Sequence, residues 1–270
     1  MKLSIVSGLN ESNKKPDEVY DKFSNICELI SQFNYDGIEL SLLEPERLDA
    51  KKLDDIKQSY NLELSAIGTG STFIRFGFSL GHHDEYMRKN AIERLDKYIS
   101  FANELNSKVI IGLIRGRYTN LSSPKREKLN IKTSLKSCVQ IAENNNVILV
   151  FEPINRFEID SYNTIAESVD LLEEIGSEYL RLLIDTFHTH LEEDPVYIWD
   201  FLPKVTSLVA HIHLADCTRR APGTGHFDFR AFLNIFKDAG YHDFVSIETI
   251  MKPSFEEIAK DTAHFLSVIL

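Results

Sequence analysis

A chain of 270 residues, 43% of them hydrophobic and 26% charged, has the composition of an ordinary globular protein. The length suits one large domain or two small ones, and (β/α)8 barrels commonly fall near it. The formal net charge of −11 argues against a protein that binds nucleic acid through the phosphate backbone, because such proteins need a basic surface.

Short aliphatic and β-branched segments alternate with longer amphipathic segments along the chain. Several of the short ones are apolar throughout, as strands buried on both faces should be. Between them, Asp84–Leu105 has helical periodicity, and Ser254–Ile269 opens with a capping box of Ser254 and Glu257. The predicted strands are Leu3–Ser7, Gly37–Ser41, Leu62–Ile67, Lys108–Leu113, Val147–Glu152, Leu180–Asp185, Leu208–Leu214 and Phe244–Glu248.

Eight strands in strict alternation with helices predict a parallel sheet that closes into a (β/α)8 barrel, the TIM barrel. No linker or low-complexity tract divides the chain, so we predict one domain over residues 1–270. A six-unit doubly wound fold is the alternative. It fits less well, because no GxGxxG motif follows the first strand.

Ionisable side chains lie at the ends of four consecutive predicted strands: Glu152, Asp185, His213 and Glu248. The carboxyl ends of TIM-barrel strands form one face, so these side chains are expected to meet there. An acid in this position must be paired, solvated or bound to metal, and a salt bridge or helix cap explains one such acid better than four. Three carboxylates and an imidazole suit one divalent ion, Mn²⁺, Mg²⁺ or Co²⁺, and the lack of cysteine argues against structural zinc.

The other histidines divide into two that are expected near this set and several that are expected at the surface. His211 shares a face with His213, because strand side chains alternate, and we expect it one layer deeper. His188 lies just past the sixth strand, where we expect it to contact a substrate, as we do for Arg219 and Arg220 after the seventh. Most of the others are expected at the surface: His82, His83, His190, His226, His242 and His264.

At these residues the sequence resembles the sugar isomerase/epimerase superfamily, whose members have a xylose isomerase-like TIM barrel. Within it, the chain is similar to ketose 3-epimerases of the D-tagatose and D-psicose type, and still more to 5-keto-L-gluconate epimerase. The resemblance covers essentially the whole chain and depends on several segments in order. These are Ile67–Gly70, Val109–Arg117, Glu152–Glu158, Asp185–His188, His213–Asp216 and Arg219–Phe229.

The resemblance implies a metal-dependent epimerase of a keto-sugar or keto-sugar acid. It implies that Glu152, Asp185, His213 and Glu248 bind one divalent ion, with Mn²⁺ expected ahead of Mg²⁺ and Co²⁺. It also implies that Glu152 and Glu248 are the catalytic acid/base pair, exchanging a proton through an enediolate that a metal stabilises.

By the same resemblance, Glu158, His188 and Arg219 bind the substrate. Residues 71–77 depart from the pattern of the closest relatives, in a segment expected to be a loop that lines the pocket. The identity of the sugar, and whether it is phosphorylated, therefore stay open.

Three alternatives remain at this point. If an acid/base group acted on only one face of the substrate, the same residues would catalyse an aldose–ketose or hydroxypyruvate-type isomerisation. A dehydratase is also possible, because it begins with the same proton removal. An endonuclease IV-like DNA repair nuclease is remote, because it needs more histidine ligands and a basic surface. A sugar-binding protein that has lost catalysis would be expected to lack one of these residues.

The remaining features indicate where the protein acts. Cys27, Cys138 and Cys217 form no CxxC pair, which indicates free thiols in a reducing compartment. The N-terminus shows no signal-peptide pattern, and no stretch approaches the roughly 20 apolar residues that span a membrane. We therefore expect a cytoplasmic enzyme of a small molecule, with no nucleic-acid or membrane partner and a homo-oligomer left open.

Overall fold

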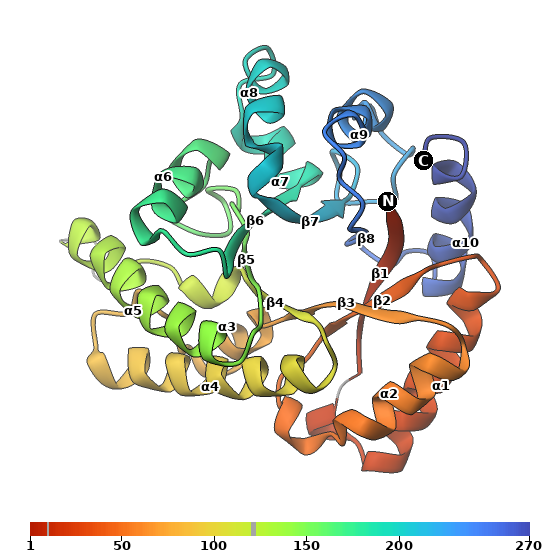
Figure 1. Ribbon diagram of the computed structural model, residues 1–270, viewed down its shortest axis with the longest axis horizontal. Coiled ribbons are helices and arrows are strands. Elements are labelled where there is room, and N and C mark those ends of the chain that lie inside the picture. Colours follow the sequence, from red (N-terminus) through yellow and green to blue (C-terminus); the bar gives the residue numbers. More distant parts are fainter. Residues whose placement is uncertain (10, 120–122) are drawn as a thin grey trace.

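The computed structural model describes residues 1–9, 11–119 and 123–270. Eight parallel strands close into a barrel in chain order, with β1 paired to β8, which confirms the predicted (β/α)8 fold (Figure 1). The strands are β1 (Lys2–Gly8), β2 (Gly37–Ser41), β3 (Glu63–Gly68), β4 (Lys108–Ile111), β5 (Leu149–Phe151), β6 (Leu180–Asp185), β7 (Val209–Leu214) and β8 (Phe244–Ile247).

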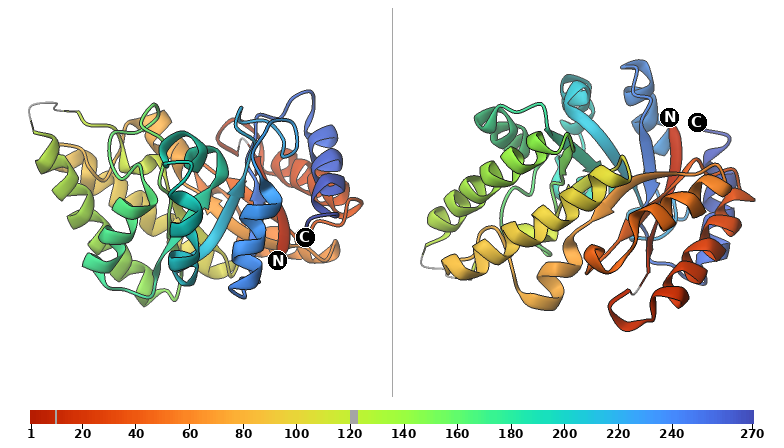
Figure 2. Two further views of the ribbon diagram at one scale, coloured as in Figure 1. Left: turned by 90° about the horizontal axis from the view of Figure 1, so that it is seen from above. Right: turned by 60° about the horizontal axis from the view of Figure 1, so that its bottom comes forward.

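Helices surround the strands, and the two ends of the chain lie side by side (Figures 1 and 2). The α10 helix begins as predicted, since Ser254 Oγ accepts a hydrogen bond from the Glu257 backbone N–H at 3.2 Å. None of the helices within the described ranges is long and apolar enough to cross a membrane. The helices are α1 (Pro16–Ser31), α2 (Ala50–Ser59), α3 (Gly70–Phe76), α4 (Glu85–Glu104), α5 (Pro124–Asn144), α6 (Ile165–Ile175), α7 (Thr186–Glu192), α8 (Ile198–Val205), α9 (Phe229–Asp238) and α10 (Phe255–Leu266).

Three strands end earlier than predicted: β4 by two residues, and β5 and β8 by one residue each. The Glu152 N–H still bonds to the Ile111 carbonyl at 3.2 Å, but Pro153 has no N–H to continue the ladder, so β5 stops at Phe151. The β4 strand ends at Ile111 because Leu113–Arg115 turns into a 3-10 helix. Both changes place the following residues at the rim of the barrel.

The segment 71–77, expected as a loop, is instead most of helix α3. Gly77 ends this helix in the left-handed region at φ 69°, where its N–H bonds to the Phe73 carbonyl at 2.9 Å. The expectation of a loop was wrong, but Ser71 and Ile74 do line a cavity beside Glu152.

The barrel interior explains why the acids meet. A small apolar cluster takes one residue from each of β3 to β7, namely Ala66, Ile110, Val150, Leu183 and Ala210. Because strand side chains alternate, Glu152 and Asp185 point the same way as Val150 and Leu183, two residues before them. The acids therefore form the next layer above an apolar floor, at the carboxyl ends of the strands.

Candidate active site

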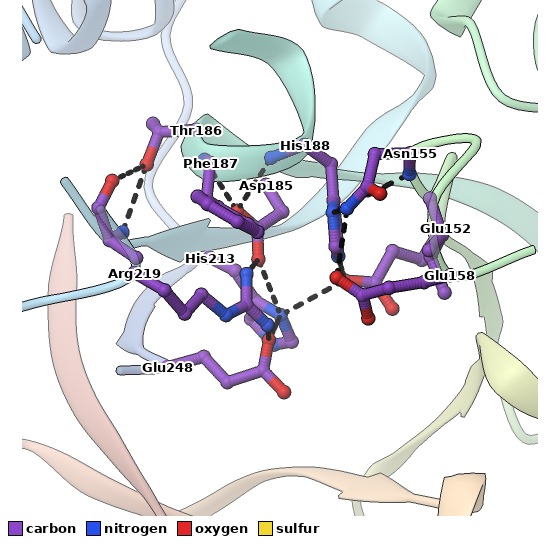
Figure 3. A network of polar contacts seen from close by, with 12 residues as sticks. Glu152, Asn155, Glu158, Asp185, Thr186, Phe187, His188, His213, Arg219 and Glu248 are labelled. Atoms are coloured by element: carbon purple, nitrogen blue, oxygen red, sulfur yellow. Dashed lines mark hydrogen bonds and ion pairs between the residues drawn. The ribbon is translucent and has the colours of Figure 1, made fainter. Parts of the chain in front are cut away.

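Four side chains converge at this rim, as Figure 3 shows. Glu152, Asp185, His213 and Glu248 each offer one ligand atom, and all four atoms lie within 4.8 Å of one another. His213 Nδ1 lies 3.1 Å from Glu248 Oε2, 3.4 Å from Glu152 Oε1 and 3.8 Å from Asp185 Oδ2. The structure thus brings together the four residues that the sequence placed at strand ends.

Two atoms of this cluster are buried without a hydrogen-bond partner in the described chain: His213 Nδ1 and Glu152 Oε1. A buried polar atom without a hydrogen bond costs about 1–3 kcal/mol, and here only ion-pair contacts within the cluster, such as His213 Nδ1 to Glu248 Oε2 at 3.1 Å, offset that cost. Burial opposes protonation of His213, but the Glu39, Glu248 and Glu152 carboxylates outweigh burial and hold the His213 pKa well above its usual value. The cluster attracts a positive charge to its centre, and its donor set fits a divalent cation.

Glu39 of β2 orients His213, and the sequence analysis missed it. Its buried carboxylate accepts hydrogen bonds from His213 Nε2 at 3.1 Å and from His211 Nε2 at 2.8 Å. The bond fixes the proton on Nε2 of His213 and leaves Nδ1 facing the acids. Burial raises the Glu39 pKa, but His213 and His211 outweigh burial and lower it to about 2. His211 itself is fully buried behind His213.

Arg219 bridges two of the four residues. Its guanidinium donates to Asp185 Oδ2 at 2.6 Å and to Glu248 Oε2 at 2.5 Å, over the ring of Phe187. The Arg219 backbone has φ 59°, a left-handed conformation held by bonds to the Asp216 carbonyl and from the Ile250 N–H, each 2.8 Å. Arg219 therefore reaches the acids directly, while the neighbouring Arg220 is exposed.

His188 and Glu158 flank Glu152 on the other side of the cluster (Figure 3). The Asn155 amide donates to His188 Nδ1 at 2.7 Å and to Glu158 Oε1 at 2.8 Å. Because Nδ1 accepts, the His188 proton lies on Nε2, which faces Glu152 Oε1 at 3.8 Å. Asn155, which the sequence analysis did not single out, therefore holds both predicted substrate-binding residues.

Comparisons with known proteins identify the family to which the chain belongs. Residues 27–268 match the family described as the xylose isomerase-like TIM barrel. The chain belongs to that family. The predicted superfamily is thereby confirmed.

Relatives of this family member include named sugar epimerases. The L-ribulose 3-epimerase of Mesorhizobium japonicum is 26% identical over 236 residues, covering 85% of this chain and 76% of the relative. The 3-dehydro-D-guloside 4-epimerase of Escherichia coli is 24% identical over 243 residues, covering 86% of this chain and 87% of the relative. The crystal structure of D-allulose 3-epimerase from Methylomonas sp. in complex with D-allulose has a TM-score of 0.84 at 19% identity, covering 100% of this chain and 97% of that chain.

Arg115 and Gly112 also help to hold Glu152 in position. Arg115 is fully buried, donates to the Glu152 carbonyl, and lies with its guanidinium carbon 4.5 Å from the Phe151 ring centroid. Burial lowers the Arg115 pKa to about 10, so the side chain stays charged at neutral pH. A Cβ at Gly112 would lie 2.7 Å from Glu152 Oε2, so a glycine there leaves room for the carboxylate.

A cavity of about 210 Å³ opens over the cluster. Glu152, His213 and Glu248 line it together with Ser71 and Ile74 of α3. A cavity of this size above a group of ionisable side chains suits a small polar molecule rather than a polymer.

Proposed function

We propose that this chain is a keto-sugar epimerase that works with one divalent ion, Mn²⁺ first, bound by Glu152, Asp185, His213 and Glu248. The observation that supports this best is the pair of buried, unpartnered atoms, His213 Nδ1 and Glu152 Oε1, which face each other across the centre of the cluster. The names of the relatives add the reaction class: L-ribulose 3-epimerase and 3-dehydro-D-guloside 4-epimerase both invert a carbon beside a ketone.

Glu152 and Glu248 are the proposed acid/base pair. They follow β5 and β8, which lie three strands apart in the closed barrel, so they approach a bound substrate from different sides. A bound divalent ion supplies positive charge to the substrate oxygens while the proton beside the carbonyl is removed. Burial opposes ionisation of Glu248, but Arg219 and His213 outweigh it and lower the Glu248 pKa well below its usual value. Glu248 is therefore ionised, which is the form that a proton acceptor needs.

Glu152, after taking up a proton from solvent, returns it on the other face. Its Oε1 has no hydrogen-bond partner among the described residues, and the His188 Nε2–H faces it at 3.8 Å. Small movements of either side chain bring the two into hydrogen-bond range, so His188 is suited to stabilise the charge on Glu152. We propose His188, Glu158 and Arg219 as contacts of the substrate hydroxyls, since all three border the cluster.

An isomerase is the second candidate, because a single active face would move a proton between neighbouring carbons. The presence of two carboxylates that reach the centre from separate strands favours the epimerase. The cavity of about 210 Å³ and the net charge of −11 both count against a nuclease.

The test is a panel of keto-sugars and keto-sugar acids run in D₂O with Mn²⁺-loaded protein, with both epimers followed by NMR. Two opposed glutamates predict solvent deuterium at the inverted carbon of the product. The chelator-treated protein is the control and should convert nothing. A product that keeps its original hydrogen at that carbon would contradict the two-glutamate mechanism, even if the metal is required.

A further inference from the structure

A second group of metal-binding side chains lies outside the proposed active site. His190 belongs to α7, while Cys217 and His226 belong to the loop between β7 and α9. Each offers one ligand atom, and the three atoms lie within 4.8 Å of one another. Cys217 Sγ is 3.2 Å from His226 Nδ1, and the His190 and His226 ring centroids are 5.1 Å apart at 76°. Two segments that are distant in sequence thus present a thiol and two imidazoles to one point.

The loop is built to hold Cys217 and His226 together. The buried Asp216 carboxylate accepts hydrogen bonds from the backbone N–H groups of Cys217 at 2.8 Å, Gly223 at 3.0 Å and Gly225 at 2.7 Å. A Cβ at Gly225 would lie 2.6 Å from Cys217 Sγ, so the chain passes close behind the thiol only because this residue is glycine. Backbone hydrogen bonds therefore hold the main chain on both sides of the site, at Cys217 and at Gly225 next to His226.

We propose that His190, Cys217 and His226 bind a zinc-type divalent ion as a second metal site. A tetrahedral ion with sulfur at about 2.3 Å and nitrogen at about 2.0 Å holds these two donors roughly 3.5 Å apart. The Cys217–His226 distance of 3.2 Å needs to open by only a few tenths of an ångström. Both histidines are exposed, so an ion can enter from solvent and keep its fourth position for water or an added ligand.

The two sites differ in chemistry. A thiolate with two imidazoles selects soft or borderline ions, whereas three carboxylates with one imidazole suit harder ions such as Mn²⁺. The second site also joins α7 to the loop that carries Arg219, which lies between Cys217 and His226 in sequence. An ion there would fix the loop from which Arg219 reaches Asp185 and Glu248.

Co²⁺ titration tests the proposal, because a thiolate bound to Co²⁺ gives a near-ultraviolet charge-transfer band and the cluster of three carboxylates and a histidine cannot. We expect this band in the wild-type protein and in the His213→Ala variant. We expect it to disappear in Cys217→Ser, and the Zn²⁺ affinity of His190→Ala to fall by roughly tenfold or more. Cys138→Ser is the matched control and should keep the band, since Cys138 is fully buried.

Three outcomes would overturn the second site: no band in the wild-type protein, a band that persists in Cys217→Ser, or Zn²⁺ binding that is unchanged in both the Cys217 and His190 variants. Circular dichroism of each variant separates loss of the site from loss of the fold. The result is independent of the proposed epimerase, because the band in His213→Ala reports the second site alone.

Discussion

The side chains of the candidate site fall into two groups: those that we propose to contact the metal or the substrate, and those that orient them. Glu152, Asp185, His213 and Glu248 could be found from the sequence because each ends a predicted strand. Glu39 could not be found by that rule, because it lies in the middle of β2 rather than at its end. The available signal was one acid flanked by Ile38 and Leu40 in an otherwise apolar strand, a position that a charge occupies only with a partner.

Replacing Glu39 by Gln should weaken metal binding while leaving the fold intact. The variant keeps the shape but loses the charge that holds the His213 proton on Nε2, and losing such a partner lowers metal affinity about 10–100-fold. Calorimetric titration with Mn²⁺ measures the effect. The matched control is Glu63→Gln, which removes an exposed acid of β3 paired with Lys2. Equal Mn²⁺ affinity in wild type and Glu39→Gln would remove Glu39 from this role.

Replacing Arg219 by Ala should raise the KM for the best substrate while the protein still binds metal. Loss of hydrogen bonds to a charged group costs about 1.5–3 kcal/mol, which corresponds to roughly a 10–100-fold change. Arg220→Ala is the control, since this neighbour is exposed and makes no side-chain bond to the cluster in the described structure. Steady-state kinetics with a parallel Mn²⁺ titration separates the two effects. Unchanged kcat and KM in Arg219→Ala would show that Arg219 is not a substrate contact.

At the scale of elements, strands were predicted better than the connections between them. Buried parallel strands leave a continuous apolar signal, and six of the eight predicted segments agree with the observed strand to within one residue at both ends. The end of β4 was misplaced by two residues because it depends on a 3-10 turn, which the apolar run does not reveal, and β5 begins two residues later than predicted, at Leu149. Helix α3 has only seven residues, too short to show a periodic pattern.

The connections between strands and helices form side-chain clusters that hydrophobic periodicity does not predict. His190, Cys217 and His226 were interpreted separately, as surface histidines and a free thiol, because nothing in their spacing relates them. The buried Asp216 carboxylate brings Cys217 and His226 together, and α7 supplies His190 from the previous connection. Asn155 was missed for the same reason, since its two hydrogen bonds depend on the turn after β5.

The residues of the proposed metal site come from strands far apart in the sequence, and they meet only because the barrel closes between β1 and β8. The ligands come from β5 to β8, and Glu39 comes from β2 across the barrel. An ion bound there bridges segments that separate completely on unfolding, so it should stabilise the entire fold rather than one loop.

We therefore expect Mn²⁺ to raise the melting temperature of chelator-treated protein. At an ion concentration of about 100 times the dissociation constant, binding contributes about 2.7 kcal/mol, and each kcal/mol corresponds to about 2–4 °C for a domain near this size. The His213 pKa is raised in the metal-free fold, so a proton occupies Nδ1 below that pKa and must leave before an ion binds there. The Mn²⁺-induced rise should consequently be smaller at mildly acidic than at mildly alkaline pH. Differential scanning calorimetry measures it, with Asp185→Asn as the variant that should lose most of the rise, and an equal rise in that variant would contradict the proposed ligand set.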